Sequence, residues 1–130
     1  MSDFLTSLAA SASGMRAQSM RLRLSSENIA NVDTPGYRRK TVTFQNTLDR
    51  ALGTDVVKLG KVQLDKRELE RIYDPSNPLA DATGNYDGSN VNLIIEIADA
   101  RESQRSYEAN LRMFDQTRQM AKSALELLRR

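Results

Sequence analysis

The chain has 130 residues, enough for one ordinary domain or for two long helices with a small segment between them. Its 19 Lys and Arg residues are interleaved with 17 Asp and Glu residues, so nucleic-acid binding, which needs cations gathered on one face, is not expected. Cys and His are absent, which removes disulfides, thiol nucleophiles, imidazole bases and the usual zinc ligands. Aromatic residues are only 5% of the chain, a composition that suits narrow helix contacts better than a thick core.

The first predicted element is a helix from Asp3 to about Ile29, in which apolar and small residues recur every three or four positions. This is the spacing of the a and d positions of a coiled coil. Gly14 lies in the middle and favours close approach of another helix, at a cost of about 1 kcal/mol relative to Ala. The stripe consists of Leu5, Leu8, Ala12, Met15, Ser19, Leu22, Ser26 and Ile29, and its large members Leu5, Leu8, Met15 and Leu22 are candidate assembly residues.

A sharp turn follows this helix. Asn31 is expected to end it by adopting the left-handed conformation. Pro35 cannot continue a helix and Gly36 readily takes a positive φ, so Thr34–Tyr37 reads as a type II turn. The Tyr37 hydroxyl needs a hydrogen-bond partner. The cations at 38–40 that come next are expected to be solvated.

The middle segment, residues 38–90, is predicted to be a small β or extended element. "KTVTFQ" alternates as a strand does, and "DVVKLGKVQLD" alternates in part, with Gly60 as a bulge or turn. "ELERIYDP" is a candidate third strand that ends at Pro75. The stretch "PSNPLADATGNYDGSN" is dense in Pro, Gly, Asn and Asp and is predicted to be a loop.

The C-terminal segment, residues 91–130, is predicted to be one helix about 55 Å long, capped by Asn90 or Asn92. Its stripe runs through about five heptads. The positions are Leu93, Ile97, Ala100, Gln104, Tyr107, Leu111, Phe114, Arg118, Ala121, Leu125 and Leu128. Leu93, Ile97, Tyr107, Leu111, Phe114, Leu125 and Leu128 are candidate assembly residues.

Because the two helices carry narrow stripes of the same period, the expected fold is mainly α. The long N- and C-terminal helices pair as a coiled coil around a small β or extended middle segment. The first part of the chain, residues 1–37, then comprises the helix and its turn. These stripes are only partly satisfied within one chain, which leaves surface for neighbouring copies.

The string "ENIANVDTPGY" is more specific than a bare turn. It resembles the signature of the bacterial flagellar basal-body rod protein family, with Asn28, Ile29, Ala30, Asn31, Thr34, Pro35, Gly36 and Tyr37 at the matching positions. The resemblance extends over nearly the whole chain, through "SASGMRAQSMRLRLSSENIAN", "YDPSNPLAD" and "RSYEANLRMF", and the short length resembles a proximal rod subunit.

The resemblance implies a structural subunit that leaves the cell through the flagellar type III export apparatus, which needs no cleaved signal. It implies helical assembly with itself and other rod proteins in the rod that spans the periplasm, where the rod transmits torque from motor to hook. No cofactor, metal or small-molecule substrate is implied.

Two alternatives come from other classes. An enzyme is not expected, because no nucleophile and base converge by spacing and "DATGNYDGSN" lacks the ligand pattern of a calcium loop. A cytoplasmic helical adaptor or regulatory coiled-coil protein uses the same heptads, and the heptads alone do not separate it from a rod subunit.

Overall fold

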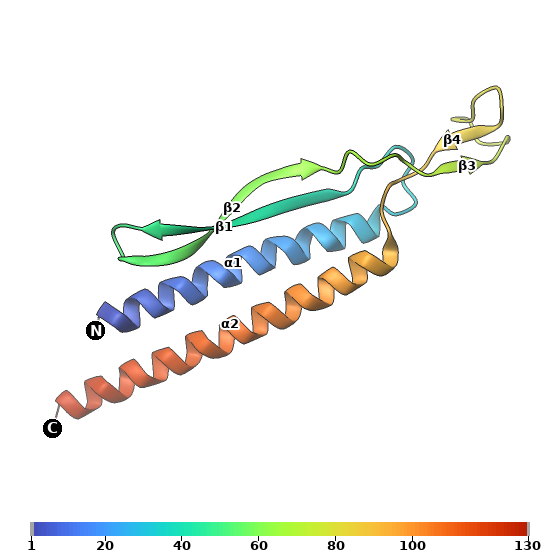
Figure 1. The fold of residues 1–130 in the computed structure, drawn as a ribbon. Coiled ribbons are helices and arrows are strands. Elements are labelled where there is room, and N and C mark those ends of the chain that lie inside the picture. Colours follow the sequence, from blue (N-terminus) through green and yellow to red (C-terminus); the bar gives the residue numbers. More distant parts are fainter. Residues whose placement is uncertain (1, 130) are drawn as a thin grey trace.

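The computed structural model describes residues 2–129, and it shows an elongated molecule built on two long helices (Figure 1). Helix α1 spans Ser2–Ala30 and helix α2 spans Leu93–Leu128. With 29 and 36 residues they make up half of the 130-residue chain, which confirms a mainly helical fold. They lie side by side and antiparallel, so both chain ends are at the same end of the molecule (Figure 1).

The ends of the helices are set by asparagines, in one case as expected and in one case not. Asn92 is the N-cap of α2, and its side chain accepts hydrogen bonds from the backbone N–H groups of Ile94 and Ile95. The expectation that Asn31 takes the left-handed conformation is wrong, because no described residue other than glycine has a positive φ. Asn31 instead donates its backbone and side-chain N–H groups to the Glu27 carbonyl. The hydrogen bonds that follow join residues three apart, so α1 ends in tighter turns.

Between the helices, strands β1 (Lys40–Asp49) and β2 (Thr54–Leu64) form an antiparallel hairpin that runs along α1 on the side away from α2 (Figure 1). The register shifts between Val42 and Phe44, opposite Gly60, so the predicted bulge is confirmed. A Cβ on Gly60 would lie 2.6 Å from the Thr43 hydroxyl oxygen, which explains why glycine stands there.

Two short strands, β3 (Arg71–Tyr73) and β4 (Asn85–Asp87), pair antiparallel in a tip that projects beyond the helices (Figure 1). The loop predicted for this stretch therefore contains a strand, and the third strand is shorter than predicted. Local hydrogen bonds hold the connecting loop: the Asp81 carboxylate accepts from Thr83, from the Asn85 backbone and from Arg71. These bonds lower the pKa of Asp81 well below its usual range.

The contact between α1 and α2 is made by small and polar side chains. Ser7 meets the Thr117 hydroxyl at 3.4 Å, and Gly14, seven residues later in α1, faces Asn110, seven residues earlier in α2. The fully buried residues of α2 are Glu96 and Ser103, also seven apart. The heptad register predicted for α2 is therefore wrong at every second stripe position, where the inner residue is the one just before the predicted one. Ser103, for example, is buried, whereas Gln104 was expected to be.

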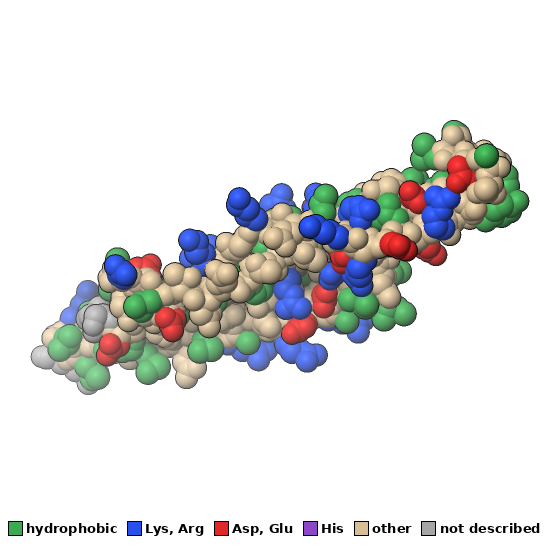
Figure 2. All heavy atoms as spheres, turned by 45° about the horizontal axis from the view of Figure 1, so that its top comes forward, with side chains coloured by type: hydrophobic (Ala, Val, Ile, Leu, Met, Phe, Trp, Pro, Cys, Tyr) green, Lys and Arg blue, Asp and Glu red, His purple; other side chains and the backbone are tan. Residues whose placement is uncertain are grey.

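The molecule is not self-contained. Its accessible surface is 9345 Å², whereas a compact monomer of 14.6 kDa is expected to expose about 6,900 Å². Only Ala17 and Leu24 form a fully buried apolar core among the described residues, whereas 18 large hydrophobic residues are exposed. Figure 2 shows apolar side chains on the surface along the length of the molecule, including the β3–β4 tip. Hydrophobic burial within one chain is consequently small.

Candidate assembly interface

The turn after α1 has the geometry that its sequence predicts. Gly36 has a φ of 74°, and the Tyr37 backbone N–H donates to the Thr34 carbonyl at 3.1 Å, as a type II turn requires. The Gly36 N–H points the other way and donates to the carbonyls of Asp87 and Gly88. The turn therefore joins the end of α1 to the base of the β3–β4 tip.

Asn28 is the centre of a second joint, and its side chain is fully buried. Its Oδ1 accepts from the Tyr37 hydroxyl at 2.8 Å and from the Lys40 N–H at 2.9 Å, while its Nδ2 donates to the Lys40 carbonyl at 2.9 Å. Partial burial and the nearby Glu27 carboxylate raise the pKa of Tyr37, which keeps the phenol protonated as a donor. Asn28 and Tyr37 thus hold the start of β1 against α1, which gives the family signature a structural role.

Arg39 forms the third and largest joint, and the expectation that residues 38–40 are merely solvated is wrong. Its Nε donates to Glu96, whose side chain is fully buried at the start of α2, and its Nη2 donates to Asp99 at 3.0 Å. The Arg39 backbone N–H also donates to Asn90 Oδ1 at 2.6 Å. One residue therefore ties the base of the hairpin to the first turns of α2.

Sequence reasoning missed the bonds that Arg39 makes to Asn90 and Glu96. The available signal was Glu96 itself, a lone carboxylate within the apolar run "LIIEIA", which needs a cation if that run is packed. Asn90, the other predicted cap of α2, bridges instead, since its Nδ2 donates to the carbonyls of Asp65 and Arg67.

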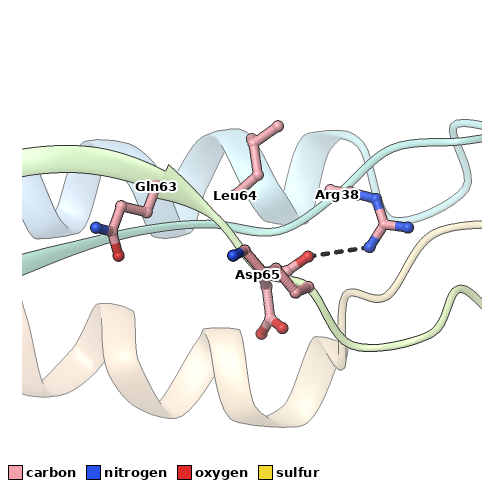
Figure 3. Close-up of a pocket in the computed structure, with 5 residues that line it drawn as sticks. Arg38, Gln63, Leu64 and Asp65 are labelled. Carbon is pink, nitrogen blue, oxygen red and sulfur yellow. Dashed lines mark hydrogen bonds between the residues drawn. The ribbon is translucent and has the colours of Figure 1, made fainter.

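The hollow beside this joint is a shallow polar one, between the end of β2 and the segment after the turn (Figure 3). Arg38 crosses it and donates to the Asp65 carbonyl at 3.2 Å. Hydrogen bonds from Arg67 lower the pKa of the Asp65 carboxyl, so this carboxylate stays charged near Arg39. Every polar group that lines the hollow thus has a structural partner or faces solvent.

Valine in place of Gly36 is expected to reduce the free energy of unfolding by about 1–3 kcal/mol, because a β-branched residue resists positive φ. The cost is conformational, since no heavy atom beyond Gly36 and its two chain neighbours lies within 4 Å of the position of a Cβ there. Urea unfolding followed by circular dichroism measures it.

The matched control is Gly36→Asn, because asparagine tolerates the left-handed region and should retain most of the stability. Equal stability of the valine and asparagine variants would show that the turn conformation contributes nothing.

None of the candidate assembly residues is fully buried in the contact between α1 and α2. Leu8, Met15, Leu22, Tyr107 and Phe114 are half-buried at its margins. The remaining candidate assembly residues are exposed, by 39% to 79%, and they are Leu5, Leu93, Ile97, Leu111, Leu125 and Leu128. Their role in assembly stays a prediction.

Met15 and Tyr107 line one hollow on the open side of the helix pair. Helical periodicity places Leu8 and Leu22 in line with Met15, and Leu111 one turn beyond Tyr107. Both predicted stripes therefore border the same open side of the pair, which leaves them available to a neighbour.

The described residues contain no cluster of acidic side chains that would hold a metal ion. Within residues 2–129, neither long helix combines the length and hydropathy of a membrane span.

Two family models match the chain. The model "Flagella basal body rod protein" matches residues 8–38, and "Flagellar basal body rod FlgEFG protein C-terminal" matches residues 82–127. The chain is 49% identical to the flagellar basal-body rod protein FlgC of Agrobacterium fabrum, over 90% of this chain and 89% of the relative. It is 34% identical to FlgC of Bacillus subtilis, over 93% and 95%, and 33% identical to FlgC of Salmonella typhimurium, over 88% and 90%.

Proposed function

The chain belongs to the FlgC family of flagellar basal-body rod proteins, and from that premise we propose that its helices pair as a coiled coil completed by neighbouring rod subunits. It is a structural subunit of the basal-body rod, not an enzyme, and its work is mechanical. The family assignment replaces the cytoplasmic adaptor considered from the heptads alone.

The strongest support for this proposal is the distribution of side chains in the helix pair, in which polar residues are inside and large apolar residues are outside. Polar side chains such as Asn28, Glu96 and Ser103 are buried inside, while leucines and isoleucines of α2 lie outside. A soluble chain that functions alone places most large apolar residues inside. In a subunit of a tube, large apolar residues on the outside are favourable, because neighbouring subunits bury that surface.

In this proposal the chain divides into three working parts. Residues 1–37 and 91–130 provide the two helices that stack with those of neighbours, and residues 38–90 form outer contacts. The signature residues Asn28–Asn31 and Thr34–Tyr37 keep these parts at a fixed angle through the bonds of Asn28, Gly36 and Tyr37. A rigid joint suits a part that transmits torque, because a compliant one would absorb the twist.

The partners in this proposal are further copies of this chain, other rod proteins and the flagellar export apparatus. Helical assembly requires a heterologous contact that does not close on itself. Export through a narrow channel requires a chain that unfolds readily, and the small buried core is consistent with that.

Glutamate in place of Leu125 is expected to abolish motility and rod assembly while the level of the protein is unchanged. Leu125 is 46% exposed in the single chain, so the substitution costs folding little, but it would place a carboxylate in an apolar contact between subunits. The measurement is swimming and basal-body yield in a flagellated host that lacks its own copy of the protein.

Leu125→Met is the matched control, since it keeps an apolar side chain of similar volume and should support swimming. Normal basal bodies in the Leu125→Glu strain would contradict an assembly role for this stripe.

A further inference from the structure

The surface of α1 between the β1–β2 hairpin and α2 contains an open hole. Arg16, Ser19, Met20 and Arg23 line the hollow that Met15 and Tyr107 also border, together with Ala12 and with Leu59 of β2. The first four stand at i, i+3, i+4 and i+7, the four positions that receive a side chain in knobs-into-holes packing. Gly14 faces α2, and Arg23 lies nine residues or two and a half turns further along, so Arg23 points away from α2, whose Tyr107 is the one residue of that helix in the lining.

The two arginines of the hole are unpaired. Neither Arg16 nor Arg23 forms a salt bridge with any residue between 3 and 129, although they lie seven residues, or about 10.5 Å, apart on one face. The hole therefore combines apolar side chains such as Met20 with two arginines one heptad apart. Its complement is an apolar side chain flanked by two carboxylates at the same spacing.

Helix α2 carries that complement. Leu111 is 39% exposed and is flanked by Glu108 and Asp115, which are also seven residues apart. Each of these acids lies five residues beyond a residue of the inner contact, Ser103 or Asn110, so each points about 140° away from α1. Within the described part of the chain, the only salt bridge they make is a 4.0 Å contact of Asp115 with Arg118.

We propose that the α2 ridge Glu108–Leu111–Asp115 of one copy seats in the α1 hole Arg16–Ser19–Met20–Arg23 of a second copy. Leu111 fills the hole, and the two carboxylates pair with the two guanidinium groups. Ridge and hole consist of different residues, so the contact is heterologous, and each copy can offer its ridge to one neighbour and its hole to another. This inference rests on the proposed function, since it needs copies that lie side by side.

The absence of cysteine allows a direct test. Two differently tagged chains, one carrying Ser19→Cys and the other Leu111→Cys, are expressed together in a host that lacks its own copy, and isolated basal bodies are oxidised. Each chain has one thiol, so any mixed disulfide joins two molecules, and it requires Cα atoms within about 7 Å. We expect this mixed disulfide to predominate over both homodisulfides. Ser26→Cys, one heptad along the same helix, is the matched control that should not react with Leu111→Cys.

The charge pairing is tested in the same way. Arg16→Glu and Arg23→Glu in the Ser19→Cys chain should reduce the mixed disulfide by about tenfold or more, because like charges then face each other. Glu108→Arg and Asp115→Arg in the Leu111→Cys chain should restore it.

Three results would each overturn this contact and leave the proposed function intact. They are an equal yield of mixed disulfide with Ser26→Cys, failure of the reversed charges to restore the disulfide, and basal bodies that contain the chain without any mixed disulfide. Absence of the chain from basal bodies would overturn both.

Discussion

Methionine in place of Arg39 is expected to lower the free energy of unfolding by about 3–5 kcal/mol, the usual cost of removing one partner of a buried ion pair. Glu96 would remain fully buried, with its second carboxylate oxygen already without a hydrogen-bond partner among the described residues. Natural domains are stable by only about 5–15 kcal/mol, and this chain has little apolar burial in reserve. The variant should therefore be largely unfolded at moderate urea concentrations where the parent is folded.

The matched control is Arg67→Met. Arg67 also pairs with a carboxylate, Asp65 at 2.7 Å, but its side chain is 60% exposed, so the expected loss is at most about 1 kcal/mol. Urea titrations followed by circular dichroism measure both variants.

A third variant distinguishes the cost of losing the ion pair from the cost of leaving the Glu96 carboxylate buried without its partner. Arg39→Met combined with Glu96→Leu removes both charges, so it should recover much of the stability lost in the single variant. If Arg39→Met and Arg67→Met lowered the free energy of unfolding equally, the buried ion pair would not hold the hairpin base to α2.

Leucine in place of Gly14 is expected to reduce the free energy of unfolding by about 1–3 kcal/mol through overpacking of the contact between α1 and α2. Even a Cβ at this position would lie 2.9 Å from the Asn110 amide oxygen, so a leucine side chain requires Asn110 to move. Leucine is a better helix former than glycine by about 1 kcal/mol, so a net loss isolates the steric effect. Since the pair must keep its shape in the rod, swimming should fail as well.

Ser26→Leu is the control for this substitution, because it adds leucine to an exposed position of the same helix and should be neutral or slightly stabilising in urea. If Gly14→Leu were as stable as the parent, the close approach of the two helices at Asn110 would not be needed.

The buried polar contact explains why the two helices remain paired despite their weak apolar attraction. Small residues such as Gly14 and Ala17 let the backbones approach, and side-chain bonds such as Arg21 to Glu102 at 3.1 Å tie them together. Polar interior contacts favour one register, because a shift would leave buried groups without partners. The large apolar residues are thereby left for contacts between subunits.

The sequence alone determined the local features of this protein. The two long helices follow from their three-to-four spacing, the type II turn from Pro35 and Gly36, the cap from Asn92, and the bulge from Gly60 in an alternating strand. Each depends on the conformational preferences of residues that are neighbours in the chain, so a short window contains the cause.

Only the tertiary structure decided which side of each helix lies inside. The heptads favour Gln104 and Leu111 for the seam of α2, whereas Ser103 and Asn110 face α1, and Arg39 reaches across 57 residues to Glu96. Periodicity shows that a stripe exists but not what will cover it, and here the most apolar stripes border an open side that suits neighbouring subunits. Such a choice depends on pairings between distant residues and between molecules, which no local preference encodes.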